Sequence, residues 1–405
     1  MSVSKPIQSY STTWIMLLAL LTSSGPLSID MYLPALPQMA MDFGITTQRV
    51  ANTLPAYFLG LALGQLIYGP LSDRIGRKTP LYFGLVLYIV ASLLCVFATS
   101  EWSLIAARIL QAVGGCVGVV IARAAIRDRL DMQSSAQAFA SMMIVMGIAP
   151  IIAPSLGALV LVFFSWQAVF VFLAFMGLVC LFCVHFFFQE SLTPERRLML
   201  SVRQVLILYG VILKEPHFRW PMLTGCFSGG ILFAYISSSA TILMDVYGLD
   251  QQQFAYAFGL KAFGIILLSM LNKKLAQQFS VLQRLKIGAM FQLLGGVILF
   301  GAGMLADSAL WIVLLGMFLA VAGIGFTGPN AMALAMAQQG ERAGTASAIM
   351  GSMQFACGLL AGIILNFLLW NALSNMAIVM LIFVIISLLA IWRFTLLPTH
   401  SDPQN

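Results

Sequence analysis

Charged side chains are scarce in this sequence. Asp, Glu, Lys and Arg make up 9% of its 405 residues and hydrophobic residues 60%, whereas soluble globular proteins average about 25% charged and 45–50% apolar residues. The formal net charge is +7, but no basic block is dense enough to indicate nucleic-acid binding. The composition gives no indication of a soluble domain of any size and indicates a protein embedded in the lipid bilayer.

Residues suited to catalysis or metal binding are few as well. The three histidines, His185, His217 and His400, lie far apart, and the sequence contains neither H-E-x-x-H nor G-x-S-x-G. Cys180 and Cys183 form a C-x-x-C inside an apolar stretch without a neighbouring His or acid, so we interpret them as packing residues. A filter segment of the kind found in channels is also missing. We therefore expect a protein that is not an enzyme, with no metal and no cofactor.

What the sequence does contain is a series of apolar stretches separated by Gly, Pro or charged residues. Each is long enough for a helix that crosses a bilayer, which needs about 20 mostly apolar residues. Backbone groups in a membrane must bond within their own segment, and an alternating barrel pattern is absent, so we expect helices. The twelve predicted spans are 12–38, 48–72, 79–98, 101–124, 136–162, 166–188, 216–246, 251–272, 283–305, 309–338, 343–368 and 371–397.

The longest polar connection, residues 189–215, divides these spans six and six. We predict an all-α membrane protein with twelve transmembrane helices in two six-helix pseudo-symmetric bundles: an N-terminal bundle at 1–188, a cytoplasmic linker at 189–215 and a C-terminal bundle at 216–405. Two such halves are typical of transporters that bind their substrate between them. The apolar part of the linker fits either an amphipathic helix on the membrane surface or a plain tether.

Positive charges are distributed on one side of the predicted spans. Of the 21 Lys and Arg residues, all but Arg49, Arg108 and Lys261 lie on the side of the even-numbered connections and the termini. The positive-inside rule then places both termini in the cytoplasm. No short apolar segment with a cleavage site precedes the first span, so we expect that span to stay uncleaved.

Three charged residues remain at membrane depth. Asp30 in the first span and Arg108 in the fourth both lie about 10–12 Å below the outer membrane edge, at 1.5 Å per residue, and Lys261 lies near the midplane. Ionisable groups at such depth are costly and mark pathways for protons or substrates. Burial favours the neutral form of a carboxyl group, whereas a nearby cation favours its charged form. A carboxyl group under both influences can gain and lose a proton. Because Arg108 does not titrate, we expect it to tune Asp30 or to carry a hydrogen-bond relay.

Two of these charges also have a structural interpretation. Asp30 would then be a headgroup-level residue or a satisfied hydrogen-bonding group, and Arg108 a strut between helices. Lys261 would hold an anionic group of a substrate, titrate, or neutralise Asp30. A small-molecule site is mainly apolar with a few polar groups, and the candidates to line it, each also suited to plain packing, are Tyr235, Asn330, Gln354, Phe233 and Phe258.

The connection between the second and third spans reads G-P-L-S-D-R-I-G-R-K-T-P-L, from Gly69 to Leu81. It resembles the signature G-x-L-a-D-r-x-G-r-k-x-x-l of the major facilitator superfamily. The two glycines that begin and divide it permit tight turns and close helix approach, and its acid and second arginine are spaced for an i,i+4 ion pair. The resemblance implies a cytoplasmic gate formed by Gly69, Asp73, Arg74, Gly76 and Arg77.

Two further motifs resemble the same superfamily. L-x-x-x-R-x-x-Q-A-x-G-G, which begins at Leu104, is similar to its proton-coupling motif, with Ala112 in place of the usual glycine; this implies proton-coupling roles for Arg108 and Gln111. G-I-A-P-I-I-A-P-S-L-G-A resembles its antiporter motif, although it ends in Gly-Ala rather than Gly-Gly. Small residues and prolines let helices pack closely and bend. The resemblance implies conformational roles for Gly147, Pro150, Pro154 and Gly157.

The first span, with S-I-D-M-Y-L-P-A-L-P from Ser28, is similar to the bicyclomycin-resistance (Bcr/CflA) type of bacterial drug:proton antiporter, as are A-L-G-Q-L-I-Y-G-P and G-T-A-S-A from Gly344. The resemblance implies that Asp30 couples proton movement to substrate binding. It also implies a monomeric exporter of drug-like small molecules in the bacterial inner membrane. Leu17–Leu27 contains no second acid, and Leu271–Gly288, the second-half counterpart of the gate loop, is degenerate. A proton-coupled importer of a metabolite, sugar or peptide remains the alternative.

Overall fold

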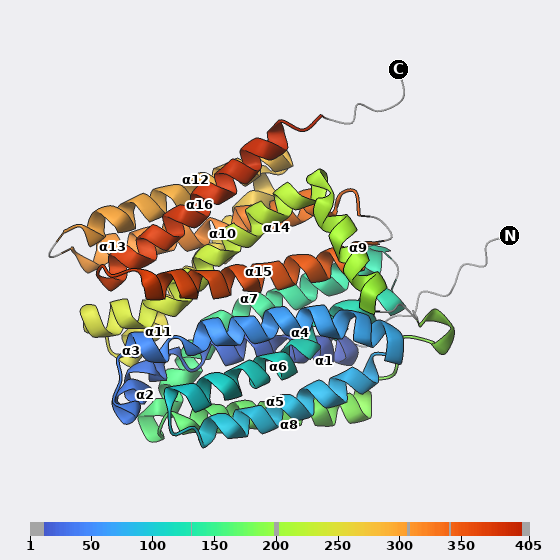
Figure 1. The fold of residues 1–405 in the computed structure, drawn as a ribbon, viewed down its shortest axis with the longest axis horizontal. Helices are drawn as coiled ribbons and strands as arrows, with labels where there is room; N and C mark the ends of the chain where they lie inside the picture. Colours follow the sequence, from blue (N-terminus) through green and yellow to red (C-terminus); the bar gives the residue numbers. More distant parts are fainter. Residues whose placement is uncertain (1–11, 131, 198–201, 306–307, 340–341, 399–405) are drawn as a thin grey trace.

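The computed structural model describes residues 12–130, 132–197, 202–305, 308–339 and 342–398, and the side chains of 12, 132–137, 139–147, 196, 202 and 343 are outside the described set. In these residues eleven helical segments are long and apolar enough to cross a membrane. Helix α7 (Met132–Phe163) supplies a twelfth segment, which is apolar over the shorter stretch Ile148–Phe163. The predicted all-α fold with twelve membrane-spanning segments is therefore confirmed (Figure 1).

The first six spans occupy the chain up to residue 187. They are formed by α1 (Thr12–Asp30) with η1 (Leu33–Ala35) and α2 (Leu36–Phe43), α3 (Thr47–Val50) with α4 (Thr53–Ile75), α5 (Lys78–Val96), α6 (Glu101–Arg129), α7, and α8 (Gln167–Phe187). A connection with the short helices η2 (Pro194–Arg196) and α9 (Val202–Lys214) follows.

The second six spans begin at residue 216. They are formed by α10 (Pro216–Ala240) with the π-helical η3 (Thr241–Val246), α11 (Gln251–Leu275), α12 (Val281–Gly303), α13 (Leu310–Ala322) with α14 (Ile324–Met336), α15 (Ala343–Phe367) and α16 (Ala372–Thr395). Several starts are fixed by local chemistry. Capping boxes begin α6, α11 and α12, where the side chains of Ser100, Asp250 and Ser280 each accept a hydrogen bond from the third backbone N–H of the helix.

The first span is not the continuous helix expected over 12–38. Helix α1 ends at Asp30, and the chain continues through η1 and α2 as far as Phe43. Pro34 and Pro37 each occupy the first turn of one of these short helices, where a missing N–H is tolerated, whereas within a longer helix they would break its hydrogen bonds. The break places Asp30 at a helix end inside the membrane-spanning segment.

The two sets of six spans form two bundles that lie side by side (Figure 1). We call the end of the molecule where α1 begins, α16 ends and α9 lies the linker end, and the other end the opposite end. Between the bundles, α4 packs on α15 and α7 packs on α11. At the opposite end, the amide of Asn366 donates a hydrogen bond to Asn52 Oδ1 at 2.7 Å. Further along the same interface, Ser352 Oγ bonds to the carbonyl oxygen of Ala62.

Part of the connection 189–215 is helical, as α9, and the location of this helix on the membrane surface stays a prediction. Helix α9 packs on α10 and α15 of the second bundle. Its Tyr209 hydroxyl donates to the carbonyl oxygen of Leu66 in α4 of the first bundle, at 3.4 Å. One face, with Val205 and Ile212, is buried, whereas Leu206, Ile207 and Val211 are exposed. The linker helix therefore contacts both halves.

Candidate functional site

Asp30 is the last residue of α1, and its side chain is 3% exposed. One carboxyl oxygen, Oδ1, is buried without a hydrogen-bond partner among the described residues. The backbone beyond the break is held closely by α7: a Cβ atom added at Gly157 would lie 1.8 Å from the carbonyl oxygen of Met31. Only glycine permits this contact between α1 and α7. The small residue of the predicted antiporter motif thus positions the segment that carries Asp30.

Lys261 is the charged residue that acts on Asp30 across the boundary between the two bundles. It lies on α11, is 3% exposed, and interacts electrostatically with the Asp30 carboxyl group without forming an ion pair with it. Its Nζ lies 3.1 Å from the ring centre of Phe258 and 3.8 Å from that of Tyr235. No described residue accepts a hydrogen bond from this ammonium group. The two aromatic faces attract it through cation–π interactions.

Arg108 is fully buried, but it does not pair with Asp30. The ion pairs among the described residues involve other arginines, so the matched depth of Asp30 and Arg108 does not bring their charges into contact. The Arg108 guanidinium instead lies 4.4 Å from the ring centre of Tyr32 and 4.1 Å from that of Tyr57. The tuning of Asp30 by Arg108 stays a prediction without a direct contact to support it.

The hydrogen-bond relay expected around Arg108 has a geometric basis. Arg108 Nη1 donates to Gln111 Oε1 at 2.6 Å, and Gln111 Nε2 donates to Ser92 Oγ at 2.8 Å. All three side chains are buried. The arginine and glutamine of the predicted proton-coupling motif are thus joined, as their spacing of one helical turn allows.

Aromatic rings from both bundles meet at the interface. Phe58 of α4 lies 4.4 Å, centre to centre, from Phe233 of α10, and Phe233 lies 5.5 Å from Phe355 of α15. Tyr235 and Phe258 form another pair, at 5.6 Å, beside Lys261. Sequence reasoning missed Phe58 and Phe355, because one Phe among the 29 in an apolar chain gives no distinguishing signal.

One of the predicted lining residues lies elsewhere. Asn330 is buried and donates to Asn272 Oδ1 at 3.0 Å, and Asn272 lies eleven residues along α11 from Lys261, a rise of about 16 Å. Arg284 also donates to Asn272, at 2.9 Å. This amide cluster occupies the degenerate counterpart of the gate loop. Gln354 is exposed and lies against Gly229 of α10.

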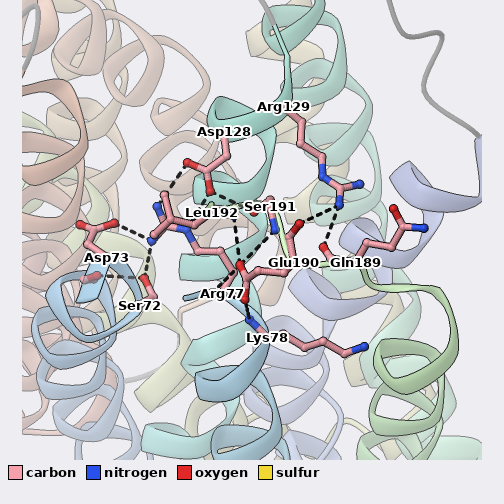
Figure 2. Close-up of polar contacts among 11 residues, drawn as sticks. Ser72, Asp73, Arg77, Lys78, Asp128, Arg129, Gln189, Glu190, Ser191 and Leu192 are labelled. Atoms are coloured by element: carbon pink, nitrogen blue, oxygen red, sulfur yellow. Dashed lines mark hydrogen bonds and ion pairs between the residues drawn. The ribbon is translucent and has the colours of Figure 1, made fainter. Parts of the chain in front are cut away.

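The predicted gate loop forms a compact ionic cluster at the linker end (Figure 2). Arg77 Nη1 lies 2.5 Å from Asp73 Oδ1, which confirms the i,i+4 pair, and Arg77 Nε lies 2.8 Å from Asp128 Oδ2 at the end of α6. Ser72 Oγ accepts a further bond from Arg77, at 2.7 Å. The Arg77 side chain is only 6% exposed, so its charge is balanced by two carboxylates in a partly dry environment.

Glu190 of the linker docks against the same loop, and sequence reasoning missed it. Its carboxylate accepts hydrogen bonds at 2.9–3.0 Å from the backbone N–H groups of Arg77, Lys78, Ser191 and Leu192 (Figure 2). Burial alone would raise the pKa of Glu190, but these four N–H groups lower it below its usual 4.5. The position of this carboxylate, directly after the end of a predicted span, was the feature of the sequence that could have indicated its role.

The glycines and prolines of the two motifs differ in what they do. Gly76 has φ +98° and a Cβ there would lie 2.7 Å from Glu190 Oε2, so glycine is required at this turn. Gly69 lies within α4 with nothing near its missing side chain, so it does not mark a close helix approach. Pro150 and Pro154 lie within the continuous helix α7. Gly147 falls among the α7 residues whose side chains are outside the described set.

The remaining residue of the predicted gate, Arg74, is exposed.

A cavity of about 390 Å³ opens between the bundles at the linker end. Its walls come from α4, α6, α9 and α15. The lining residues are Gln65, Gly69, Pro70, Ser72, Asp73, Arg77, Val120, Arg123, Ala124, Arg127, Asp128, Val205, Leu208, Tyr209, Arg342, Gly344, Thr345, Ser347 and Ala348. The bundles are therefore in contact at the opposite end and separated by this cavity at the linker end.

Two helical bundles around a buried charged site, with a cavity open at one end, define a multi-pass membrane transporter. The comparison of its sequence with known families agrees with this class. The chain belongs to the Major Facilitator Superfamily, whose family model matches residues 18–362. The resemblance of the loop Gly69–Leu81 to that superfamily is thereby confirmed.

Its relatives include bacterial transporters and resistance proteins. An uncharacterized MFS-type transporter of Bacillus subtilis strain 168, YdgK, is 32% identical over 344 residues, covering 84% of this chain and 85% of the relative. A bicyclomycin resistance protein homolog of Haemophilus influenzae is 28% identical over 388 residues, covering 96% and 97%. The multidrug resistance protein MdtL of Citrobacter koseri is 30% identical over 334 residues, covering 82% and 83%. The expected similarity to the bicyclomycin-resistance type is confirmed.

Solved structures share the fold. A D-xylose–proton symporter superposes with a TM-score of 0.74 at 14% identity, covering 96% of this chain and 98% of the other. A bacterial homologue of the human lysosomal transporter Spinster, in an inward-facing and occupied conformation, gives 0.68 at 16% identity, covering 97% of each chain. At such low identity the likeness extends to the fold alone.

Proposed function

We propose that this protein exports small drug-like molecules in exchange for protons, by alternating access between its two bundles. Two relatives carry bicyclomycin or multidrug resistance in their names, which supports export. The antiporter-like motif that ends at Gly157 supports the same direction. Moving one charge through 100 mV supplies roughly 2.3 kcal/mol, so a proton gradient is a sufficient driving force.

The observation that carries the proposal is the position of Asp30. Its carboxyl group is buried at a helix break between the bundles, has an oxygen without a hydrogen-bond partner among the described residues, and interacts with Lys261 of the opposite bundle. A structural hydrogen-bonding role would leave no such unpaired oxygen. A carboxyl group placed so is suited to exchanging a proton when the bundles move and its surroundings change.

In the proposed cycle, unprotonated Asp30 favours the state that is open at the linker end, and substrate enters between the bundles there. Phe233, Tyr235, Phe258 and Lys261 form the wall that receives it, with Asp30 as the acidic partner. A proton taken up from the other side of the membrane weakens substrate binding, and the substrate leaves at the opposite end. Arg108 and Gln111 provide the hydrogen-bond relay. Lys261, rather than Arg108, supplies the positive charge that interacts with the Asp30 carboxyl group.

The moving bodies in this proposal are 1–188 and 216–405, joined by the linker 189–215. The ionic cluster around Arg77 steadies one state at the linker end, and the Asn52–Asn366 contact closes the opposite end. We place the protein in the bacterial inner membrane as a monomer, with the linker end and both termini in the cytoplasm. The cations of the even-numbered connections support this orientation.

The first experiment measures export and its coupling. The chain is produced in an efflux-deficient bacterium and tested against a panel of drugs that includes bicyclomycin. A drug to which it gives resistance is then added to purified protein in weakly buffered solution. We expect proton release in the wild type and a release at least about tenfold smaller in Asp30→Asn, because the variant has no carboxyl group at this position to lose a proton.

Asp250→Asn is the matched control. Asp250 caps α11 at the membrane surface, and Asn is an equally good capping residue, so one carboxyl group is removed without loss of the helix start. Normal proton release by Asp30→Asn would remove Asp30 from the coupling role. Net uptake of the drug in cells, abolished by an uncoupler, would reverse the direction and indicate an importer.

A further inference from the structure

The cavity at the linker end has an excess of positive charge in its lining. Four arginines and two aspartates line it, so the lining carries a net charge of +2. Both carboxylates are already engaged, because Asp73 and Asp128 each bind Arg77. Arg123, Arg127 and Arg342 therefore face the cavity, and none of them forms an ion pair with another residue that the structure describes.

Arg123 and Arg127 lie one turn apart on α6 and both reach the cavity. Neither side chain donates a hydrogen bond to any residue in the described part of the chain, and the carboxylates of Asp73 and Asp128 act on Arg127 only at longer range. Arg127 extends across the gap, since its Nη1 lies 2.7 Å from the position of a Cβ added at Gly344 of α15. Like charges at this spacing repel each other, and an anion between them would relieve that repulsion.

Arg123 is the less exposed of the two arginines, since its side chain is half-buried whereas that of Arg127 is exposed. Gln65 and Val120 line the same cavity. The cavity volume falls in the range of about 300–1,000 Å³ that is typical of small-molecule sites.

We propose that this cavity is an anion-binding vestibule, in which Arg123 and Arg127 hold the carboxylate, sulfonate or phosphate of an amphipathic ligand. The ligand is either a soluble anion on its way to the Asp30 site or the headgroup of an anionic lipid, which share this chemistry. The inference deepens the proposed function, because the vestibule lies at the end from which an exporter takes its substrate. Planar guanidinium groups are suited to such anions by their paired donors.

The test uses the full-length protein in nanodiscs of neutral phosphatidylcholine and measures binding by fluorescence anisotropy. Fluorescein is the anionic probe, and rhodamine 6G, a cation with the same xanthene core, is the matched probe. We expect the wild type to bind fluorescein and the variant Arg123→Gln/Arg127→Gln to bind it about tenfold more weakly. The affinity of the wild type for fluorescein should also fall as the NaCl concentration rises from 50 to 500 mM. Rhodamine 6G binding is expected to be insensitive to the double substitution.

Lys273→Gln/Lys274→Gln is the control, since it removes two charges at the linker end outside the cavity. Arg123→Lys/Arg127→Lys keeps the charge if the glutamine variant folds poorly, and should retain most binding. In discs containing phosphatidylglycerol, loss of fluorescein binding together with arginine-dependent lipid retention by native mass spectrometry would identify the headgroup as the ligand. Equal binding of fluorescein and equal lipid retention in wild type and both arginine variants would overturn the proposal. Binding is measured without transport, so failure of proton coupling would leave this result intact.

Discussion

At the scale of single residues, the site combines two unsatisfied groups. The Asp30 carboxyl group and the Lys261 ammonium group are both buried, and each has a polar atom without a hydrogen-bond partner among the described residues. Such groups usually destabilise a fold by about 1–3 kcal/mol each. Natural proteins keep them where function requires them. The pair is therefore expected to reduce the stability of the fold.

Lys261→Met tests this trade-off. Methionine has a similar volume and no charge, and it packs well against the rings of Phe258 and Tyr235. Replacing a buried, poorly paired charge by an apolar side chain is often neutral or stabilising, so we expect the melting temperature of the purified protein to rise by about 2 °C or more. Drug-induced proton release is expected to fall at least about fivefold, because Asp30 loses the charge that acts on it.

Differential scanning fluorimetry and the proton-release measurement are made on the same preparation. Phe263→Met, an exposed position two residues further on α11, is the matched control and should change neither quantity. A lower melting temperature for Lys261→Met with unchanged proton release would show that the ammonium group is a structural element and that Asp30 works without it.

At the scale of helices and loops, the gate loop is tied to the start of the linker. Arg77 joins the end of α4 to the end of α6 through Asp73 and Asp128, and Glu190 binds the backbone at Arg77 and Lys78 (Figure 2). A row of backbone N–H groups around one carboxylate is an anion-binding arrangement. These hydrogen bonds tie the loop between α4 and α5 to the start of the linker.

This contact predicts a pH dependence of stability. The pKa of Glu190 is lowered in the folded protein, so its ionised form stabilises the fold at pH values above its usual 4.5, and this contribution is lost as the pH falls through the lowered value. We expect Glu190→Gln to melt at a lower temperature than wild type at pH 7, and the difference to shrink below pH 4. Melting curves of both proteins between pH 3.5 and 8 check this, and a difference that is constant over the whole range would contradict it.

At the scale of the whole molecule, the two bundles touch at the opposite end and part at the linker end. The contacts run along α4 and α15, from the Asn52–Asn366 hydrogen bond to the bond between Ser352 and Ala62. The rings of Phe58 and Phe233 meet between these two points. Alternating access requires this interface to separate while the linker-end cavity closes.

Linking the opposite end covalently should therefore stop the cycle. In Asn52→Cys/Asn366→Cys, a short bis-methanethiosulfonate reagent is expected to join the two thiols, since the native amides lie 2.7 Å apart. Drug efflux from cells should then fall to the background level and recover after reduction. Each single cysteine variant, treated alike, serves as the control. Undiminished efflux by the fully linked double variant would mean that this interface does not open during transport.

The sequence by itself determined the class of molecule and its local features. The apolar stretches give the spans, because a membrane forces each segment to satisfy its own backbone hydrogen bonds. The pairing of Asp73 with Arg77 and of Arg108 with Gln111 follows from helical spacing alone. Pro34 and Pro37 are a sequence signal for a helix break in this segment, but the sequence does not show that the helix ends at Asp30.

Only the tertiary structure decided which distant residues meet. Lys261 rather than Arg108 acts on Asp30, Glu190 completes the gate loop, Asn330 binds Asn272 away from the site, and Arg123 lines a cavity with α15. Hydrophobic periodicity records only that a face is buried. The choice of neighbour depends on how the helices of the two bundles pack, which brings together residues that are distant in the sequence.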